Sequence, residues 1–407
     1  MEFVRGRLVH TLGIAALGAA LVGCNAIAPS GAPSSPLVVG IDWDRVASVE
    51  RPANYEETVS PSYVAKHPIL RIRGQATPSD VTSLPGGGFV AVGYAPPDWV
   101  PFAWTSPDGD RWSIHPMGST EFTFPVAVAT GADGTVVAVG RSGSEPVAWT
   151  TRDGRAWDRH AVAIIAGGGM PERITSVTAW PNGFVAGGSV GPELADRHAR
   201  FWQSPDGITW TPVPDDEAVF ANAEVRAITH FQDGFLAVGV VGTAQDPTGA
   251  VAWFSRDGRV WKRIGDPAFD GGVAASVAVA PWGGFVAVGS TIDRKGAVAW
   301  ISQDGLAWTR APDEASRQHS GGFAWMTDVA AIGEVAVAVG DVQGLQRGTA
   351  EGWVTRDGLT WTMSRSAPVQ EGAEFYAIFP SGAGALTVGA FGAPDSYVPE
   401  VWITPGR

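Results

Sequence analysis

The sequence contains few cysteine, histidine and cationic residues. It has one cysteine and seven histidines, and 41 acidic residues outnumber 28 Lys and Arg residues, which gives a net charge of −13. A single cysteine excludes a disulfide within the chain and a cysteine-based metal site. The histidines follow no metal-ligand spacing, and no phosphate-binding or dinucleotide-binding motif is present. We therefore expect no metal and no cofactor, and the acidic balance argues against nucleic acid as a partner.

Long helical patterns are also missing. After residue 24, no long stretch carries apolar residues at helical spacing, whereas the chain holds 53 glycines and 30 prolines. This composition favours short strands joined by turns, and it predicts an all-β protein.

The pattern Ser/Thr-x-Asp-Gly-x-x-Trp occurs six times, and six copies cannot all be one active site. Its aspartates are Asp108, Asp153, Asp206, Asp257, Asp304 and Asp357. We expect each carboxylate to accept backbone N–H groups across a tight turn, the glycine to adopt a positive φ and the tryptophan to pack on a neighbouring blade. The carboxylates are spread along the chain rather than clustered, so we interpret them as structural and not as calcium ligands.

A second pattern, an apolar strand that ends in glycine, occurs seven times. These closing glycines are Gly93, Gly140, Gly188, Gly239, Gly289, Gly340 and Gly389, which gives a period of 47 to 51 residues. Each repeat contains four short strand patterns. Four-stranded units repeated at this period predict a β-propeller of seven blades over residues 38–407.

The last repeat supplies only three strands. The stretch 40–47 resembles residues 154–161, where an outermost strand is expected to begin. We predict that this N-terminal strand completes blade seven, which would leave no open edge in the ring.

The N-terminal segment predicts where the protein is located. Arg5 and Arg7 precede an apolar run, residues 11–23, that is short for a membrane span and ends before Cys24. The segment resembles bacterial lipoprotein signals. That resemblance implies a signal peptide at 1–23, a lipid on Cys24 and a place on the extracytoplasmic face of the cell membrane, and the composition of residues 24–37 predicts a flexible tether. The alternative is an ordinary signal followed by a free cysteine.

The six Asp-Gly turns resemble those of Asp-box, or BNR-repeat, propellers, the group that includes sialidases. If sialidase activity came with the resemblance, the comparable residues would be Asp98 as acid, Tyr376 as nucleophile, and Arg71 and Arg73 for a substrate carboxylate. The chain departs from that family where it reads Ala76-Thr77-Pro78 at the first strand, and in having seven repeats instead of six. Sialidase-like glycoside hydrolysis is therefore an alternative hypothesis.

Long loops fall on one face of the predicted propeller, where binding residues usually gather. Charged candidates near the starts of innermost strands are Glu172, Arg173, Glu224, Arg226, Asp328 and Glu374, and aromatic candidates are Trp99, Trp325 and Tyr397. Solvated strand ends and blade packing are the alternative interpretations. We favour a monomeric, lipid-anchored, non-enzymatic binding or scaffold protein for a protein or glycan partner. An assembly factor for a membrane complex, implied by resemblance to other Asp-box propellers, is a further alternative.

Overall fold

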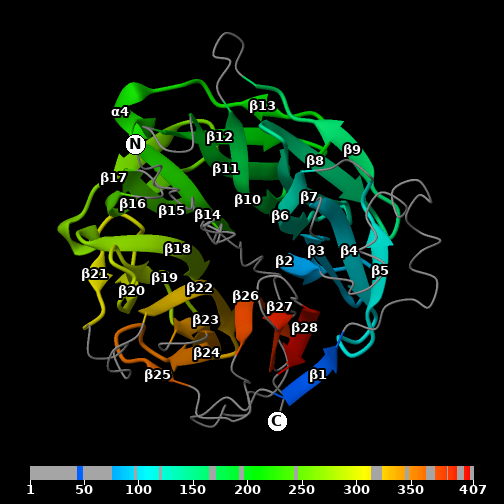
Figure 1. Cartoon of the computed structure of the whole chain (residues 1–407). Helices are drawn as coiled ribbons and strands as arrows, with labels where there is room; N and C mark the ends of the chain where they lie inside the picture. The colour runs from blue at the N-terminus through cyan, green and yellow to red at the C-terminus, as the bar shows by residue number, and fades with distance from the viewer. Residues whose placement is uncertain are drawn as a thin grey trace, which may run out of the picture.

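The protein is a seven-bladed β-propeller, as the repeats predict. The computed structural model describes residues 44–48, 76–95, 99–118, 122–164, 171–191, 197–242, 246–312, 323–343, 348–363, 372–382, 384–391 and 398–403. These residues form seven antiparallel sheets of four strands, arranged around a common axis (Figure 1). The predicted signal peptide and tether lie outside the described residues.

Six blades are continuous in sequence, and each runs from its innermost to its outermost strand. Blades 1 and 2 comprise β2 (Thr77–Ser83), β3 (Phe89–Ala95), β4 (Val100–Ser106), β5 (Ser113–Pro116), β6 (Thr123–Thr130), β7 (Val136–Ser142), β8 (Glu145–Thr151) and β9 (Asp158–Ala161). Blades 3 and 4 comprise β10 (Glu172–Trp180), β11 (Gly183–Val190), β12 (His198–Ser204), β13 (Thr211–Pro212), β14 (Ala223–Phe231), β15 (Gly234–Gly242), β16 (Pro247–Ser255) and β17 (Trp261–Ile264). Blades 5 and 6 comprise β18 (Gly272–Val279), β19 (Phe285–Thr291), β20 (Ala297–Ser302), β21 (Thr309–Arg310), β22 (Phe323–Ile332), β23 (Val335–Gln343), β24 (Gly348–Thr355) and β25 (Thr362–Met363).

Blade 7 is built from both ends of the chain. Its strands are β26 (Ala373–Ser381), β27 (Gly384–Phe391), β28 (Val398–Ile403) and the N-terminal β1 (Asp44–Ser48). β1 runs antiparallel to β28, and Asp44 is paired with Ile403. Figure 1 shows the blue β1 beside the red β28. The predicted closure is confirmed by the described strand at 44–48, and residues 40–43 of the predicted stretch lie outside the described residues.

Among the described residues, two short helices lie in the connections between blades. The α-helix α4 (Glu217–Phe220) precedes blade 4, and the 3-10 helix η1 (Pro267–Phe269) precedes blade 5. Backbone carbonyls within them accept hydrogen bonds from third-strand tryptophans, at 2.9 Å from Trp253 and 2.7 Å from Trp300. Both helices therefore close over a buried indole ring. Within the described part of the chain, no helix has the length and apolar character needed to cross a membrane.

The innermost strand of every blade contains a bulge opposite the closing glycine. In blade 4 the register shifts between Val225 and Ala227, which leaves Arg226 as the extra residue. A Cβ atom on Gly239 would overlap the carbonyl oxygen of Glu224 across the two strands. The same overlap, with the carbonyl two residues before the bulged residue, occurs at all seven closing glycines. The repeated glycine is therefore required by the bulge, because any side chain would push the first two strands apart.

The six Asp-Gly turns attach the outer parts of blades 1 to 6 to the preceding blade in the ring. In blade 3, Asp206 Oδ1 accepts the backbone N–H groups of Ile208 and Thr209, at 2.9 and 2.8 Å. Trp210 Nε1 donates to the carbonyl of Gly207, whose φ is +77°. A Cβ on Gly207 would collide with Val137 of blade 2. The glycine is therefore needed both for its φ and for the close approach of two blades.

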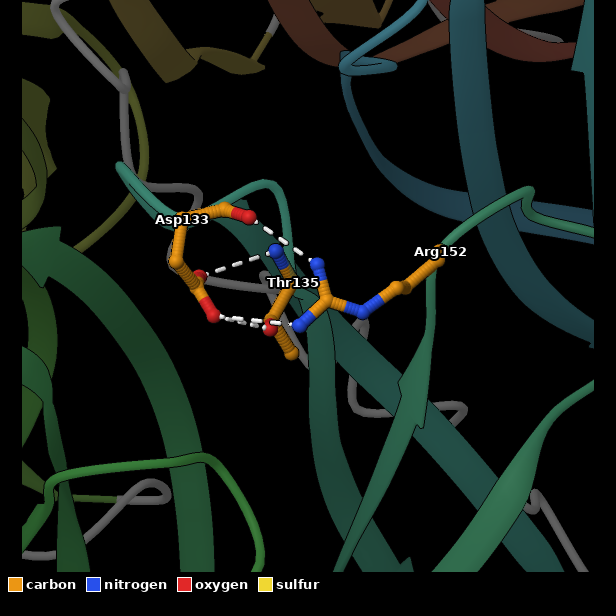
Figure 2. Close-up of polar contacts among 3 residues, drawn as sticks. All are labelled: Asp133, Thr135 and Arg152. Atoms are coloured by element: carbon orange, nitrogen blue, oxygen red, sulfur yellow. Dashed lines mark hydrogen bonds and ion pairs between the residues drawn. The ribbon is translucent and has the colours of Figure 1, made fainter.

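An additional contact links the two turns of blade 2. Arg152, in the outer turn, donates to the carbonyl oxygen of Asp133 at 2.9 Å and to its carboxylate at 3.3 Å (Figure 2). The same carboxylate accepts from the backbone and hydroxyl of Thr135. Arg152 and Asp133 are largely exposed, so we expect this ion pair to add little stability. These turns define one face of the propeller, which we call the hairpin face. The connections between blades and between second and third strands define the opposite loop face.

The bulge contact gives a direct stability test. We expect Gly239→Ala to destabilise the protein by about 1–3 kcal/mol or more, because the new methyl group must displace the Glu224 carbonyl or separate two strands. The matched control is Gly265→Ala, where no atom lies within 4 Å of the added Cβ. The measurement is the free energy of unfolding in urea. Equal stability of the two variants would contradict the proposed role of the bulge.

Candidate functional site

Each blade has one cross-strand pair of residues next to its closing glycine, on the side toward the loop face. The first residue of the pair lies on the innermost strand, two places before the bulged residue. The second residue lies on the second strand, directly after the closing glycine. The pairs are Thr77 with Tyr94, Phe124 with Arg141, Arg173 with Ser189, Glu224 with Val240, Val273 with Ser290, Trp325 with Asp341, and Glu374 with Ala390. Aromatic and charged side chains are concentrated in blades 6, 7, 1 and 2, which are neighbours in the ring.

In blade 7, Glu374 and Tyr376 are directly linked. The Tyr376 hydroxyl donates a hydrogen bond of 2.6 Å to Glu374 Oε2. Both residues lie on β26 and are half-buried, and Tyr376 is the bulged residue of this strand. The sequence predicted each residue separately. The bulge at Tyr376 lets its hydroxyl group reach the Glu374 carboxylate on the same strand.

In blade 6, a buried carboxylate lies next to this pair. Asp341 on β23 accepts a hydrogen bond from the backbone N–H of Phe375 in blade 7, at 3.2 Å, and another from the Trp325 side chain. Burial raises the pKa of Asp341 well above its usual range, and the nearby Glu374 raises it further. Two carboxyl groups therefore interact across the boundary between blades 6 and 7.

In blades 1 and 2, three aromatic rings pack together. The ring of Trp99 lies 5.5 Å from those of Tyr94 and Phe124, and the latter two are 5.1 Å apart. The Arg141 guanidinium lies 4.2 Å from the centre of the Phe124 ring, within the range of a cation–π contact. Burial raises the pKa of Tyr94 to about 12, while the charge of Arg141 lowers it and that of Glu374 raises it. Tyr94 thus connects the aromatic cluster electrostatically with blade 7.

We name these residues together the aromatic–acidic site. Its members are Tyr94, Trp99, Phe124, Arg141, Trp325, Asp341, Glu374 and Tyr376.

Trp99 has a strained backbone at this site. Its φ is +56°, a conformation that bulky residues seldom adopt. The strain is held in place because the Trp99 carbonyl accepts a hydrogen bond of 2.7 Å from Thr123 at the start of blade 2. Strained residues of this kind cluster at binding sites, where they fix the direction of a side chain.

A second group of charges, in blades 3 and 4, is internally compensated. Glu224 is buried, accepts a hydrogen bond from Arg197 and forms an ion pair with Arg226, whose Nε lies 3.2 Å from Glu224 Oε1. Asp215 lies 3.8 Å from Arg200, which is also buried. Because each of these carboxylates lies next to an arginine, we interpret the group as a structural link between the two blades and not as a catalytic site.

Two buried aspartates connect neighbouring blades through the bulges. Asp328 accepts from Ser276 of blade 5 at 2.7 Å, and from the backbone of Ile378 in blade 7 at 2.9 Å. Asp80 accepts from the backbone of Val128 in the same way, at 2.7 Å. Asp328, predicted as a binding-face residue, therefore lies inside the ring, where it supplies hydrogen bonds between blades.

The remaining predicted residues are less informative. Glu172 is buried and Arg173 half-buried at the start of β10. Asp98, Arg71, Arg73, Tyr397 and Cys24 lie outside the described residues. Among the residues that the structure does describe, no three His, Cys, Asp or Glu side chains are grouped closely enough to hold a metal ion.

Sequence reasoning missed Tyr94, Phe124, Arg141 and Asp341. Three of them directly follow a closing glycine, at Gly93, Gly140 and Gly340. The glycine is the same in all seven repeats, whereas the residue after it differs from repeat to repeat. This variable position next to a constant one is the sequence signal that could have identified these residues.

Comparison with known proteins supports the fold but not an activity. No protein-family model and no curated protein matches the chain. Among solved structures, the WD40 β-propeller domain of Doa1 matches with a TM-score of 0.53 at 12% identity, covering 89% of this chain and 97% of that domain. A protein of unknown function from Dyadobacter fermentans matches with a TM-score of 0.48 at 17% identity, over 82% and 95% of the two chains. Trypanosoma rangeli sialidase matches with a TM-score of 0.48 at 11% identity, over 81% of this chain and 54% of the sialidase. At such identities the Doa1 match shows the propeller fold alone.

The buried aspartates predict a pH-dependent stability. Burial raises the pKa of Asp328 to about 7, against about 3.9 in an unfolded chain. The folded protein then binds more protons than the unfolded chain between these values, so stability falls as pH rises from about 4 to about 7 and levels off above. Relative to Asp328→Asn, we expect the wild type to lose stability over this interval in urea titrations. Asp304→Asn is the control, because hydrogen bonds from backbone N–H groups lower the pKa of Asp304, and its effect belongs below pH 4. A pH-independent difference between wild type and Asp328→Asn would contradict the assignment.

Proposed function

We propose that the protein is a lipid-anchored, extracytoplasmic binding protein whose aromatic–acidic site recognises a glycan. The strained, half-buried Trp99 within the cluster of Tyr94 and Phe124 carries this proposal. Aromatic rings stack on the apolar faces of sugars at little entropic cost, because they have few rotatable bonds. Aromatic rings that are fixed by their packing form a preorganised recognition surface.

The neighbouring polar groups suit the rest of a sugar. Glu374 can accept hydrogen bonds from hydroxyl groups, Arg141 carries N–H donors, and the Tyr376 oxygen, whose proton is donated to Glu374, can act as a further acceptor. Charged hydrogen-bond partners discriminate between hydroxyl arrangements more strongly than apolar contact does. The combination therefore favours a binding site with specificity over a general adhesive surface. The lipid anchor, supported by the sequence around Cys24, would hold this site at the cell surface.

The first test is glycan binding by Trp99→Ala. We expect the purified wild type to bind members of a glycan array, and Trp99→Ala to bind the same glycans at least about tenfold more weakly, since a lost stacking anchor costs about 1–2 kcal/mol or more. Affinity is measured by titration of tryptophan fluorescence.

Ile208→Ala is the matched control, since Ile208 is exposed on the hairpin face. Unchanged affinity of a folded Trp99→Ala variant would contradict the proposal. Absence of glycan binding, with a cell-surface protein captured by crosslinking, would replace the glycan by a protein partner.

The hydrogen bond between Tyr376 and Glu374 favours a second candidate function, glycoside hydrolysis of the sialidase kind. In that reaction Glu374 would take the phenol proton, and the Tyr376 oxygen would attack the anomeric carbon as the glycosidic bond breaks. A separate acid must protonate the departing oxygen, and water must then release the sugar. The candidate for that acid, Asp98, lies outside the described residues.

Fluorogenic glycosides, including a sialoside, distinguish the two functions. We expect no turnover by the wild type, since binding is the proposed function. Turnover that is reduced at least about a thousandfold in Tyr376→Phe would instead establish the hydrolase, because phenylalanine removes the nucleophilic oxygen and keeps the ring. Activity that persists in Tyr376→Phe would exclude this residue as the nucleophile.

A further inference from the structure

We infer that the hairpin face of the propeller rests on the lipid bilayer, with Val260 at the centre of the contact, so that the loop face points away from the membrane. This inference rests on the proposed lipid anchor, and it adds an orientation and a membrane-contacting surface to it. Two observations carry it, the point where the chain enters the ring and the side chains that this face exposes.

The chain enters the ring at the hairpin face. Asp44, the first residue of β1, is paired with Ile403 at the end of β28. Ile403 also lies close to the Asp-Gly turn of blade 1, because its side chain is the nearest group to the position that a Cβ atom on Gly109 would occupy. The start of β1 therefore lies among the hairpin turns, whereas its end, Ser48, lies toward the loop face.

The connection to the lipid is short. Nineteen residues lie between Cys24 and Asp44, and a chain of that length spans about 70 Å at full extension. A relaxed chain of this length spans only about 25 Å. With the attachment point on the hairpin face, this face can approach the bilayer directly, whereas turning the loop face to the bilayer would require the chain to pass around the rim.

The hairpin face also exposes apolar side chains on three successive blades. These are Ile208 of blade 3, Val260 of blade 4 and Leu306 of blade 5, with 48%, 75% and 40% of their surfaces exposed. All three occupy the two variable places between glycine and tryptophan in the Asp-Gly turns. The same places in blades 1 and 2 hold Asp110-Arg111 and Arg155-Ala156. One sector of the face is therefore apolar at its tips.

Basic side chains accompany the most exposed of these residues. Arg256, Arg259 and Lys262 flank Val260 and are exposed. The carboxylate of the same turn, Asp257, is occupied by hydrogen bonds from the backbone N–H groups of Arg259 and Val260, both at 2.9 Å. An apolar tip bordered by arginine and lysine fits the boundary between acyl chains and phosphate headgroups.

The test uses the full-length lipidated protein in phosphatidylcholine vesicles that contain a lipid spin-labelled in the headgroup region. Val260→Cys and Ile292→Cys each receive an environment-sensitive fluorophore, and Ile292, exposed on the loop face, is the matched control. We expect quenching to lower the emission at position 260 at least about twofold, as for groups inserted about 5–10 Å into the interface, and to leave position 292 unchanged.

The outcomes separate the two proposals. If the unlabelled wild type does not fractionate with membranes, both the lipid anchor and the orientation are contradicted. The same holds if the Cys24→Ser variant fractionates with membranes as well as the wild type does. If the protein is anchored through Cys24 but position 260 is unquenched, or position 292 is quenched more strongly, the orientation alone is overturned. A further variant combines labelled Val260→Cys with Ile208→Asp and Leu306→Asp. Loss of quenching at position 260 in this variant would further support a contact made by three blades.

Discussion

The overlap between a bulged strand and a closing glycine is the constraint on which this propeller depends. At every innermost strand an extra residue turns a carbonyl oxygen toward the second strand, where only glycine leaves room for it. The bulge bends and twists the strand, and bent strands are what allow a sheet to pack beside the next around an axis. The bulge also directs the side chain of its extra residue, which is Arg226 in blade 4 and Tyr376 in blade 7.

The same device separates structural positions from variable ones. The glycine is constant because the carbonyl excludes a side chain. The residue that carries this carbonyl and the residue that directly follows the glycine are free to vary. Blade 5 has Val273 and Ser290 at these places, while blade 6 has Trp325 and Asp341. A ring of equivalent blades can in this way carry a site on one sector without any change to its frame.

The fold could be predicted from the sequence because its requirements repeat. The closing glycines and the Asp-Gly turns with their tryptophans recur at one period, and the missing strand of the last repeat has a match near the N-terminus. Phe124 and Asp341 could not be placed, because their neighbourhood depends on bulges that shift the register by one residue. Asp328 was predicted to line the binding face because it lies near the start of an innermost strand, whereas in the folded protein it is buried and accepts hydrogen bonds from residues of three blades.

The pairing of β1 with β28 has a consequence for how the protein is made. β1 can pair only after β28 has been synthesised, so the ring stays open until the strands of all seven blades are available. Contacts between residues so far apart in sequence slow folding, since a long loop must close before they can form. During that interval blade 7 presents unpaired backbone at its edge, and exposed strand edges of this kind favour aggregation of incompletely folded chains. The last hydrogen bonds to form would then convert an open array, whose blades fray independently, into a single cooperative unit.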